Sequence, residues 1–336
     1  MKKIGNNTYI PAYPVTVKAW QAIVGQKERE GPLGKYFDLY SDDEYFGQET
    51  YEKAEAQMQK EAVDRVYQKA NCRDEDIDFI FAGDLLNQCV SSAYGSRDRG
   101  VGYFGLYGAC STVIEASIIA SMAIDGGFAS QALAVTSSHF CTAERQYRYP
   151  LDYGSLRPPS AQWTVTGAGC LLLTNETLNG MPKISAFCPG TIVDMGISDI
   201  NNMGAAMAPA AADTLKKFFD DTRSSPDDYD LIVTGDLGSI GHELVKNLLG
   251  RENITLGANY LDCGMMIFDA DKQDVHAGGS GCGCCASVLA AYILPMMRTG
   301  LYKNVLVAAT GALMSPTMNQ QGESIPAISH LIRLTV

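Results

Sequence analysis

The sequence lacks long apolar runs and an excess of positive charge. No stretch of about 18 apolar residues, the length that a membrane-spanning helix requires, occurs in the 336 residues. The formal net charge is −12, from 26 basic and 38 acidic residues. Nucleic acids and anionic lipid surfaces both attract clustered basic residues, so the composition argues against either as a partner.

The sequence also lacks a secretory signal, and it lacks the two separated cysteine pairs that a zinc site would need. The opening residues, MKKIGNNTYIPAYP, contain two lysines but no apolar core, so we expect a soluble protein of the cytoplasmic type. Three of the ten cysteines, Cys282, Cys284 and Cys285, crowd one glycine-rich turn. Zinc sites usually combine two separated pairs of ligands. We therefore expect buried, reduced thiols, no metal site and no bound cofactor.

What the chain does contain is a repeat of itself. The segment IDFIFAGDLLNQ at 77–88 resembles YDLIVTGDLGSI at 229–240, and the block 109–139 matches 282–312 without a gap. In the longer match, Phe128 aligns with Leu301. Because both matches come in the same order, we infer an ancient duplication. The first half is predicted to span residues 1–178 and the second half residues 179–336.

Each half is predicted to alternate helices with buried strands. The first half contains expected helices at 49–70 and 111–124 and expected strands at 76–84, 132–139 and 164–175. The second half repeats this order from a helix at 210–222 and a strand at 230–236, and we expect residues 203–214 to be a loop that runs into the N-terminus of that helix, with Asp213 in its first turns. The alternation predicts an α/β fold with a mixed, largely parallel sheet covered on both faces. Stacking of the two copies gives layers in the order α-β-α-β-α.

Cys110 stands where the buried helix at 111–124 is expected to begin. Free backbone N–H groups and the positive end of the helix dipole gather at such a position, and they lower the pKa of a thiol there. The same groups bind a carboxylate or an oxyanion. Three interpretations follow: a nucleophile, part of an anion-binding pocket, or a buried and inert cysteine.

A nucleophilic cysteine also needs a base, and the chain has only four histidines. His139 ends the strand that follows the Cys110 helix, so it is the candidate for this role. A hydrogen-bonded structural histidine at a strand end fits the same position. His242, His276 and His330 fall in expected helix, strand or surface positions away from Cys110.

The duplicated halves, GACST at a helix start and the late turn AGGSGCGCC resemble the fold of thiolases and ketoacyl synthases. The resemblance places the nucleophile at Cys110 and its histidine or asparagine partners on two loops of the second half. In this chain those loops hold Gly235 and Asp236, and Ser280 to Cys282. The resemblance thus implies a thiolase-like fold without the usual partners. Acyl transfer by Cys110, with His139 as an unusual base, is the alternative function.

Longer strings resemble one family in particular. They include KEREGPLGKYFD at 27–38, MGAAMAPAAADT at 203–214 and VAATGAL at 307–313, and they resemble the stage V sporulation protein AD family of spore-forming Firmicutes. The resemblance implies a non-enzymatic protein that binds dipicolinic acid (pyridine-2,6-dicarboxylate) or its calcium chelate for uptake into the developing spore. It also implies that calcium enters only within the ligand, that other stage V A proteins hold the chain at the inner spore membrane, and that two copies form a homodimer.

A flat dicarboxylate needs hydrogen-bond donors and a narrow slot. The residues expected to provide them between the halves are Cys110, Ser111, Ser137, Ser138, His139, Gly279 and Ser280. Asn87 follows a strand end, where open α/β sheets expose their sites. Arg145, with Arg148, is predicted either to clamp a carboxylate or to form a surface ion pair.

Asp84 and Asp236 occupy equivalent places in the two halves, since each follows the glycine that ends a predicted strand. A carboxylate repels a dianion. These two residues therefore suit either a neutral calcium chelate or turns with a purely structural role.

Overall fold

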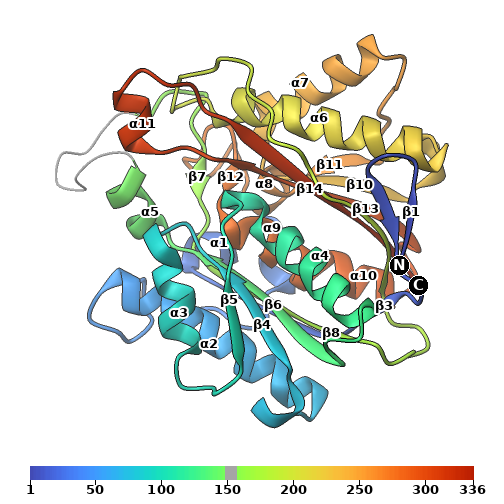
Figure 1. Ribbon diagram of the computed structural model, residues 1–336. Coiled ribbons are helices and arrows are strands. Elements are labelled where there is room, and N and C mark those ends of the chain that lie inside the picture. The colour runs from blue at the N-terminus through green and yellow to red at the C-terminus, as the bar shows by residue number, and fades with distance from the viewer. Residues whose placement is uncertain (148–156) are drawn as a thin grey trace.

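The computed structural model describes residues 1–147 and 157–336 and has five layers. Figure 1 shows helices on both outer faces, a sheet beneath each, and a further set of helices between the sheets. The outer helices are α6 (Met203–Thr222) and α7 (Gly238–Arg251) on one face and α2 (Tyr51–Ala70) and α3 (Val90–Ser96) on the other. The central ones are α4 (Thr112–Asp125), α9 (Cys282–Val288) and α10 (Leu294–Arg298). The predicted α-β-α-β-α order is confirmed.

The strands form two similar halves that join at one short contact. The first half runs in the order β5 (Gly102–Gly105), β4 (Phe79–Gly83), β6 (Gln131–Ser138), β8 (Gly167–Thr174) and β3 (Val15–Val24). The second runs in the order β11 (Tyr260–Asp262), β10 (Leu231–Gly235), β13 (Asn304–Ala312), β14 (Ala327–Thr335) and β9 (Lys183–Cys188). Strands β3 and β9 pair only through Val15–Ile184 and Thr16–Lys183.

The sheet is mixed, but it is less parallel than the sequence predicted. In each half three strands are parallel, whereas β8 and β3, and likewise β14 and β9, pair antiparallel. The reason is the path of the chain: α5 (Phe140–Tyr147) and α11 (Pro316–Gln320) stay at one end of the molecule (Figure 1). The next strand of each sheet therefore begins at the same end of the molecule at which the previous strand finished. It must run in the opposite direction.

The internal repeat corresponds to matching elements in space. Helix α4 aligns with the end of α9, the π-helical stretch Leu289–Ile293 and α10, while β6 aligns with β13. Phe128 and Leu301 both lie on the turn after their central helix, where they are 77% and 59% exposed. The gap-free match in the sequence therefore reflects equivalent positions in the two halves.

Packing of the helices follows the apolar pattern of the sequence. Along one face of α2, Ala54, Met58, Ala62 and Val66 are fully buried, and the helix covers β3 and β8. In the central layer, α9 lies so close to β8 that a Cβ on Gly283 would stand 2.2 Å from the Gly167 carbonyl oxygen. Small residues thus allow the middle helices to fit between two sheets.

One predicted loop proves to be helical. Residues 203–214 form the first part of α6, which begins at Met203 and continues through Pro209. The Asn202 side chain accepts a hydrogen bond from the Ala205 amide and caps the helix. Alanine has the highest helix propensity of all residues, and the alanine-rich face buries Ala208 and Ala211. The prediction of a loop was therefore wrong.

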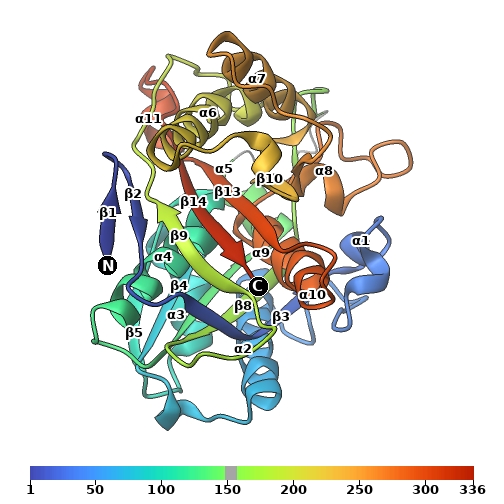
Figure 2. The same cartoon turned by 90° about the vertical axis from the view of Figure 1, so that its right-hand side faces the viewer.

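The short elements bring distant segments together. The hairpin of β1 (Lys2–Ile4) and β2 (Thr8–Ile10) lies beside β9, as Figure 2 shows. The remaining described elements include α1 (Gln26–Arg29), α8 (Cys263–Ile267) and the parallel pair β7 (Trp163–Thr164) and β12 (Gly279–Ser280). In that pair, Thr164 is the register partner of Ser280. None of the helices in the described ranges is long and apolar enough to cross a membrane.

Candidate functional site

Cys110 lies where the N-termini of two central helices meet. It belongs to a single turn, Ala109–Ser111, directly before α4. From the other half, the Gly281 amide directly before α9 donates a hydrogen bond to Cys110 Sγ at 3.2 Å. Gly281 has a φ of +115°, a conformation that glycine adopts readily and other residues rarely do. The loop that carries Ser280 to Cys282 is therefore beside Cys110, as the resemblance to thiolases and ketoacyl synthases implied.

The pKa of the Cys110 thiol is raised, whereas a position at a helix start is expected to lower it. Cys110 is only 6% exposed, and burial, together with the nearby Asp236, raises the pKa of the thiol above its usual range. The Gly281 amide acts in the opposite direction but is the weaker influence. Because desolvation outweighs the backbone amides, Cys110 carries its proton at neutral pH.

Asp236 lies in the interior next to this thiol. Its side chain is fully buried, and within the described chain no hydrogen bond of normal geometry reaches either carboxylate oxygen. Burial raises the pKa of Asp236 well above its usual value, helped by Cys285 and Asp262, although the Cys284 thiol and the Gly281 amide lower it somewhat. Burial thus favours the protonated form of Asp236, and the residue does not line the cavity described below.

His139 has no ring nitrogen available for Cys110. Its Nε2 lies 2.8 Å from the Glu44 carbonyl oxygen, and its Nδ1 accepts a hydrogen bond from the Cys141 amide at 3.1 Å. The ring is buried, and burial lowers the pKa of the imidazole. The arrangement fixes a neutral tautomer with its proton on Nε2. This is the structural histidine that the sequence left open as one interpretation.

A small cavity opens beside Cys110 between the two halves. It measures about 40 Å³. Its lining is apolar on most sides with hydroxyl groups at a few points, and consists of Leu85, Tyr107, Ala109, Cys110, Ala143, Glu144, Tyr147, Thr164, Met203, Ser280, Ala312 and Met314. Of the ligand-binding residues predicted from the sequence, Cys110 and Ser280 lie on this lining.

The other predicted donors bind protein groups instead. The hydroxyls of Ser111, Ser137 and Ser138 donate to the Gly108 carbonyl, the Glu55 carboxylate and the Val165 carbonyl at 2.6, 2.9 and 2.7 Å. The carbonyl oxygen of Gly279 accepts from the Gln162 side chain at 3.0 Å. The Ser137 bond connects β6 to α2, the Ser138 bond connects β6 to the residue after β7, and the Gly279 bond connects β12 to the residue before β7. These three bonds hold the walls of the site in place, whereas the Ser111 bond lies within its own turn.

Asn87, Arg145 and Asp84 also lie away from the cavity. Asn87 is exposed, and its backbone amide donates to the Gln146 side chain. Arg145 forms the surface ion pair that was one of its two predicted roles, with its Nη1 2.8 Å from Glu52. Asp84 accepts hydrogen bonds from the amides of Leu86 and Ser92 and from the Ser92 hydroxyl, which favours the structural-turn interpretation. Arg148 lies outside the described residues.

Sequence reasoning missed the tyrosines of the cavity. Tyr107 directly precedes Gly108 and lies three residues before Cys110, and Tyr147 ends α5. Their hydroxyl oxygens are 2.6 Å apart. A tyrosine follows no spacing rule that distinguishes a pocket position from a surface position. Only the fold brings the two side chains together.

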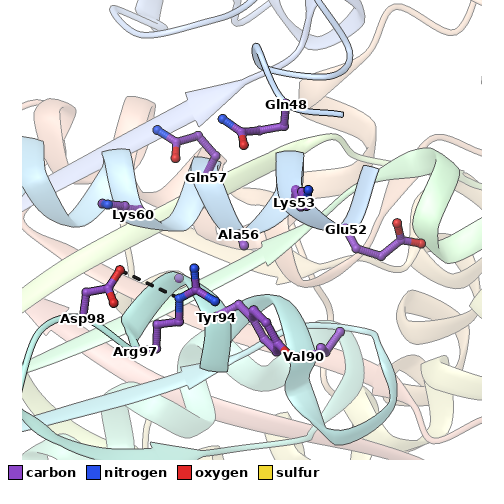
Figure 3. Close-up of a pocket in the computed structure, with 11 residues that line it drawn as sticks. Gln48, Glu52, Lys53, Ala56, Gln57, Lys60, Val90, Tyr94, Arg97 and Asp98 are labelled. Carbon is purple, nitrogen blue, oxygen red and sulfur yellow. Dashed lines mark ion pairs between the residues drawn. The ribbon is translucent and has the colours of Figure 1, made fainter. Parts of the chain in front are cut away.

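A second, larger hollow lies elsewhere on the surface. This groove has a volume of about 500 Å³ and lies between α2 and α3. Figure 3 shows the side chains that line it. Lysines, glutamines and acidic side chains alternate along it, and Arg97 contacts Asp98 at 3.8 Å. Tyr94, at 59% exposure, forms part of its wall. With charges of both signs and no buried titratable group in its lining, the groove offers no defined chemistry.

Comparison with known proteins shows to which family the chain belongs. Residues 5–335 match the family described as Stage V sporulation protein AD (SpoVAD). The chain belongs to this family. It is 45% identical over 330 residues to Stage V sporulation protein AD of Bacillus subtilis (strain 168), covering 98% of this chain and 97% of that protein.

Solved structures with a similar fold are condensing enzymes. The 3-oxoacyl-[acyl-carrier-protein] synthase III of Aquifex aeolicus superposes with a TM-score of 0.59 at 14% identity, covering 96% of this chain and all of the enzyme. A variant of OleA from Xanthomonas campestris gives a TM-score of 0.60 at 12% identity, covering 98% of this chain and all of that protein. At such low identity the similarity concerns the fold alone, and it confirms the thiolase-like architecture.

Proposed function

We propose that this protein binds dipicolinic acid, free or as its calcium chelate, in the Cys110 cavity, performs no catalysis, and serves uptake of the ligand into the developing spore. Membership of a sporulation family supports the biological setting. The observation that carries the proposal is a cavity beside Cys110, where the N-termini of two helices meet. The Cys110 thiol there is protonated, and both ring nitrogens of His139 already form hydrogen bonds. Such a site is suited to holding a ligand and poorly suited to attacking one.

The charges around the cavity favour the chelate over the bare dianion. Among the lining residues that the structure describes, none is lysine, arginine or histidine, and Glu144 contributes a carboxyl group. A dianion in such a place meets no opposite charge to offset its lost hydration. A one-to-one calcium chelate is neutral and avoids this cost. Calcium is thus part of the ligand, and the protein needs no resident metal or cofactor.

Isothermal titration tests the proposal. We expect pyridine-2,6-dicarboxylate to bind with one saturable site, and to bind more tightly with equimolar Ca²⁺ than with EGTA. Ca²⁺ alone serves as the control and is expected to give no heat of binding. Absence of saturable binding at millimolar ligand, with and without Ca²⁺, would exclude the function.

The same proposal covers the partners. The exposed edge strand β5 is the place for a second copy to pair, giving a homodimer. Other stage V A proteins would then hold the dimer at the inner spore membrane. Co-purification of these proteins from sporulating cells tests that association, and a chain recovered without them from detergent extracts would contradict it.

The alternative is acyl transfer by Cys110, which its position at a helix start and the condensing-enzyme fold favour. Intact-mass measurement after incubation with acetyl-CoA distinguishes the two functions. We expect no acetyl adduct, because a protonated and buried thiol is a poor nucleophile. We also expect Cys110→Ala to keep ligand binding within about threefold, since one weak thiol contact contributes less than a full hydrogen bond.

A further inference from the structure

Two tyrosines close the cavity beside Cys110 through a chain of hydrogen bonds. The hydroxyls of Tyr107 and Tyr147 lie 2.6 Å apart, and the Tyr147 hydroxyl donates to the Leu85 carbonyl oxygen. Since the hydrogen of Tyr147 is used for Leu85, its oxygen is the acceptor and Tyr107 is the donor. These hydrogen bonds connect the loop after β5, the end of α5 and the segment that follows β4.

The cavity must enlarge to admit a ligand. Pockets for small molecules usually measure about 300–1,000 Å³, whereas this one measures about 40 Å³. Most of its wall is held in place, because Leu85, Cys110 and Met314 are buried in the core. Tyr107 is 41% exposed, so one side of its ring borders solvent and the ring has room to turn outward.

The Tyr107 hydroxyl also has the right chemistry for a carboxylate. Burial raises the pKa of Tyr107 to about 12, and it raises the pKa of Tyr147 far above the usual range. Both groups therefore keep their protons and can donate at neutral pH. Hydrogen bonds to a charged acceptor are stronger than those between two neutral hydroxyls, so a carboxylate competes well with Tyr147 for the proton of Tyr107.

We propose that Tyr107 is the recognition residue of the site: its hydroxyl exchanges Tyr147 for a carboxylate oxygen of the incoming ligand. The ring turns outward as this happens and lies against the flat pyridine ring, where aromatic contact adds to the binding. Tyr147 keeps the hydroxyl of Tyr107 occupied while the cavity is empty. This inference rests on the proposed function, because it assigns a residue to the binding of the same ligand.

Three single substitutions to phenylalanine test the exchange. Tyr107→Phe removes the donor, and we expect its Kd for pyridine-2,6-dicarboxylate to rise about tenfold, the difference between a charged and a neutral hydrogen bond. Tyr147→Phe removes the competitor, while the Leu85 carbonyl keeps its hydrogen bond from the Gln146 side chain at 2.9 Å. Its Kd is therefore expected to equal the wild-type value or fall below it, with faster association in stopped flow. Tyr94→Phe, in the groove of Figure 3, is the matched control and is expected to change nothing.

A second ligand separates recognition from a structural role. With the neutral pyridine-2,6-dicarboxamide, Tyr107→Phe is expected to weaken binding much less than with the dicarboxylate. Equal weakening of both ligands, or equal loss in Tyr107→Phe and Tyr147→Phe, overturns the exchange. Thermal unfolding of each variant shows that the fold is intact. If the wild type binds and Tyr107→Phe binds equally well, the inference fails while the proposed function stands; if the wild type does not bind, the proposed function itself fails.

Discussion

At the scale of single residues, the same side chain behaves in opposite ways in two places. Asp236 is fully buried, and within the described chain no hydrogen bond of normal geometry reaches its carboxylate, so burial raises its pKa. Asp221 is partly buried, but the amides of Asn6, Asn7 and Thr8 donate to it and hold its pKa below the usual value. The pKa of each aspartate in the unfolded chain is near 3.8. The two carboxyls therefore affect stability at different pH.

We predict that Asp236→Asn increases the free energy of unfolding, relative to wild type, by a larger amount as pH rises. The folded protein keeps a proton on Asp236 that the unfolded chain has released above pH 3.8, so the folded state binds more protons and wild-type stability falls with pH. Asparagine cannot titrate and removes this loss. Urea unfolding at pH 5 and pH 8 should show the variant gaining free energy of unfolding relative to wild type as pH increases. No gain across this range would mean that Asp236 is ionised in the folded protein.

Asp221→Asn is the matched comparison and has the opposite sign. Its folded pKa is lowered, so its stabilisation is complete above the unfolded value and is lost only as pH falls through the folded value. We expect the variant to be less stable than wild type by a constant amount between pH 5 and pH 8. A difference that varies over this range would contradict the assignment.

At the scale of elements, close approach decides which glycines matter. Gly283 lies in the first turn of α9 against β8, where a Cβ would stand 2.2 Å from the Gly167 carbonyl oxygen. Gly250 lies near the end of α7, and a Cβ there would meet nothing within 4 Å. Both glycines are helical, so their different surroundings rather than their backbone conformation set the effect of a side chain.

We predict opposite effects for alanine at these two positions. Gly283→Ala forces α9 away from β8 and should lower the free energy of unfolding by about 1–3 kcal/mol. Gly250→Ala reduces the freedom of the unfolded chain and should raise it by about 0.5–1 kcal/mol. Chemical denaturation measures the free energy of unfolding of both variants. Equal changes in the two would show that α9 can accept a side chain at Gly283 without losing its packing on β8.

At the scale of the whole molecule, the sheet ends in an exposed strand. β5 is last in the strand order, and all its residues are exposed, with Phe104 at 50%. An unpaired edge with aromatic side chains is a surface on which another strand can add. This geometry supports the proposed homodimer.

We predict that Phe104→Lys converts the dimer to a monomer. A lysine at the edge strand opposes pairing because two like charges would face each other across the interface. Phe128→Lys, at another exposed aromatic on the turn after α4, should leave the dimer unchanged. Light scattering after gel filtration measures the mass of each. A wild type that is already monomeric would contradict the homodimer.

How much the sequence could tell depended on whether a property was local or repeated. Helix α2 and the buried strands followed from periodicity, and the family resemblance implied that the loops with Asp236 and with Ser280 to Cys282 lie near Cys110. The helical state of 203–214 did not follow, because a proline such as Pro209 usually ends or kinks a helix, whereas here the alanines around it favour helix. The antiparallel strands β8 and β14 depend on where a connection crosses the molecule, which no local pattern records.

The sequence by itself determined the duplicated layered fold and the position of Cys110 between the halves, because both follow from repeated patterns of apolar and small residues. Only the tertiary structure decided the state of the site. Burial keeps the Cys110 thiol protonated, Glu44 and Cys141 occupy the ring of His139, and the Tyr107–Tyr147 pair closes the cavity. These properties come from desolvation and from contacts between residues far apart in the chain.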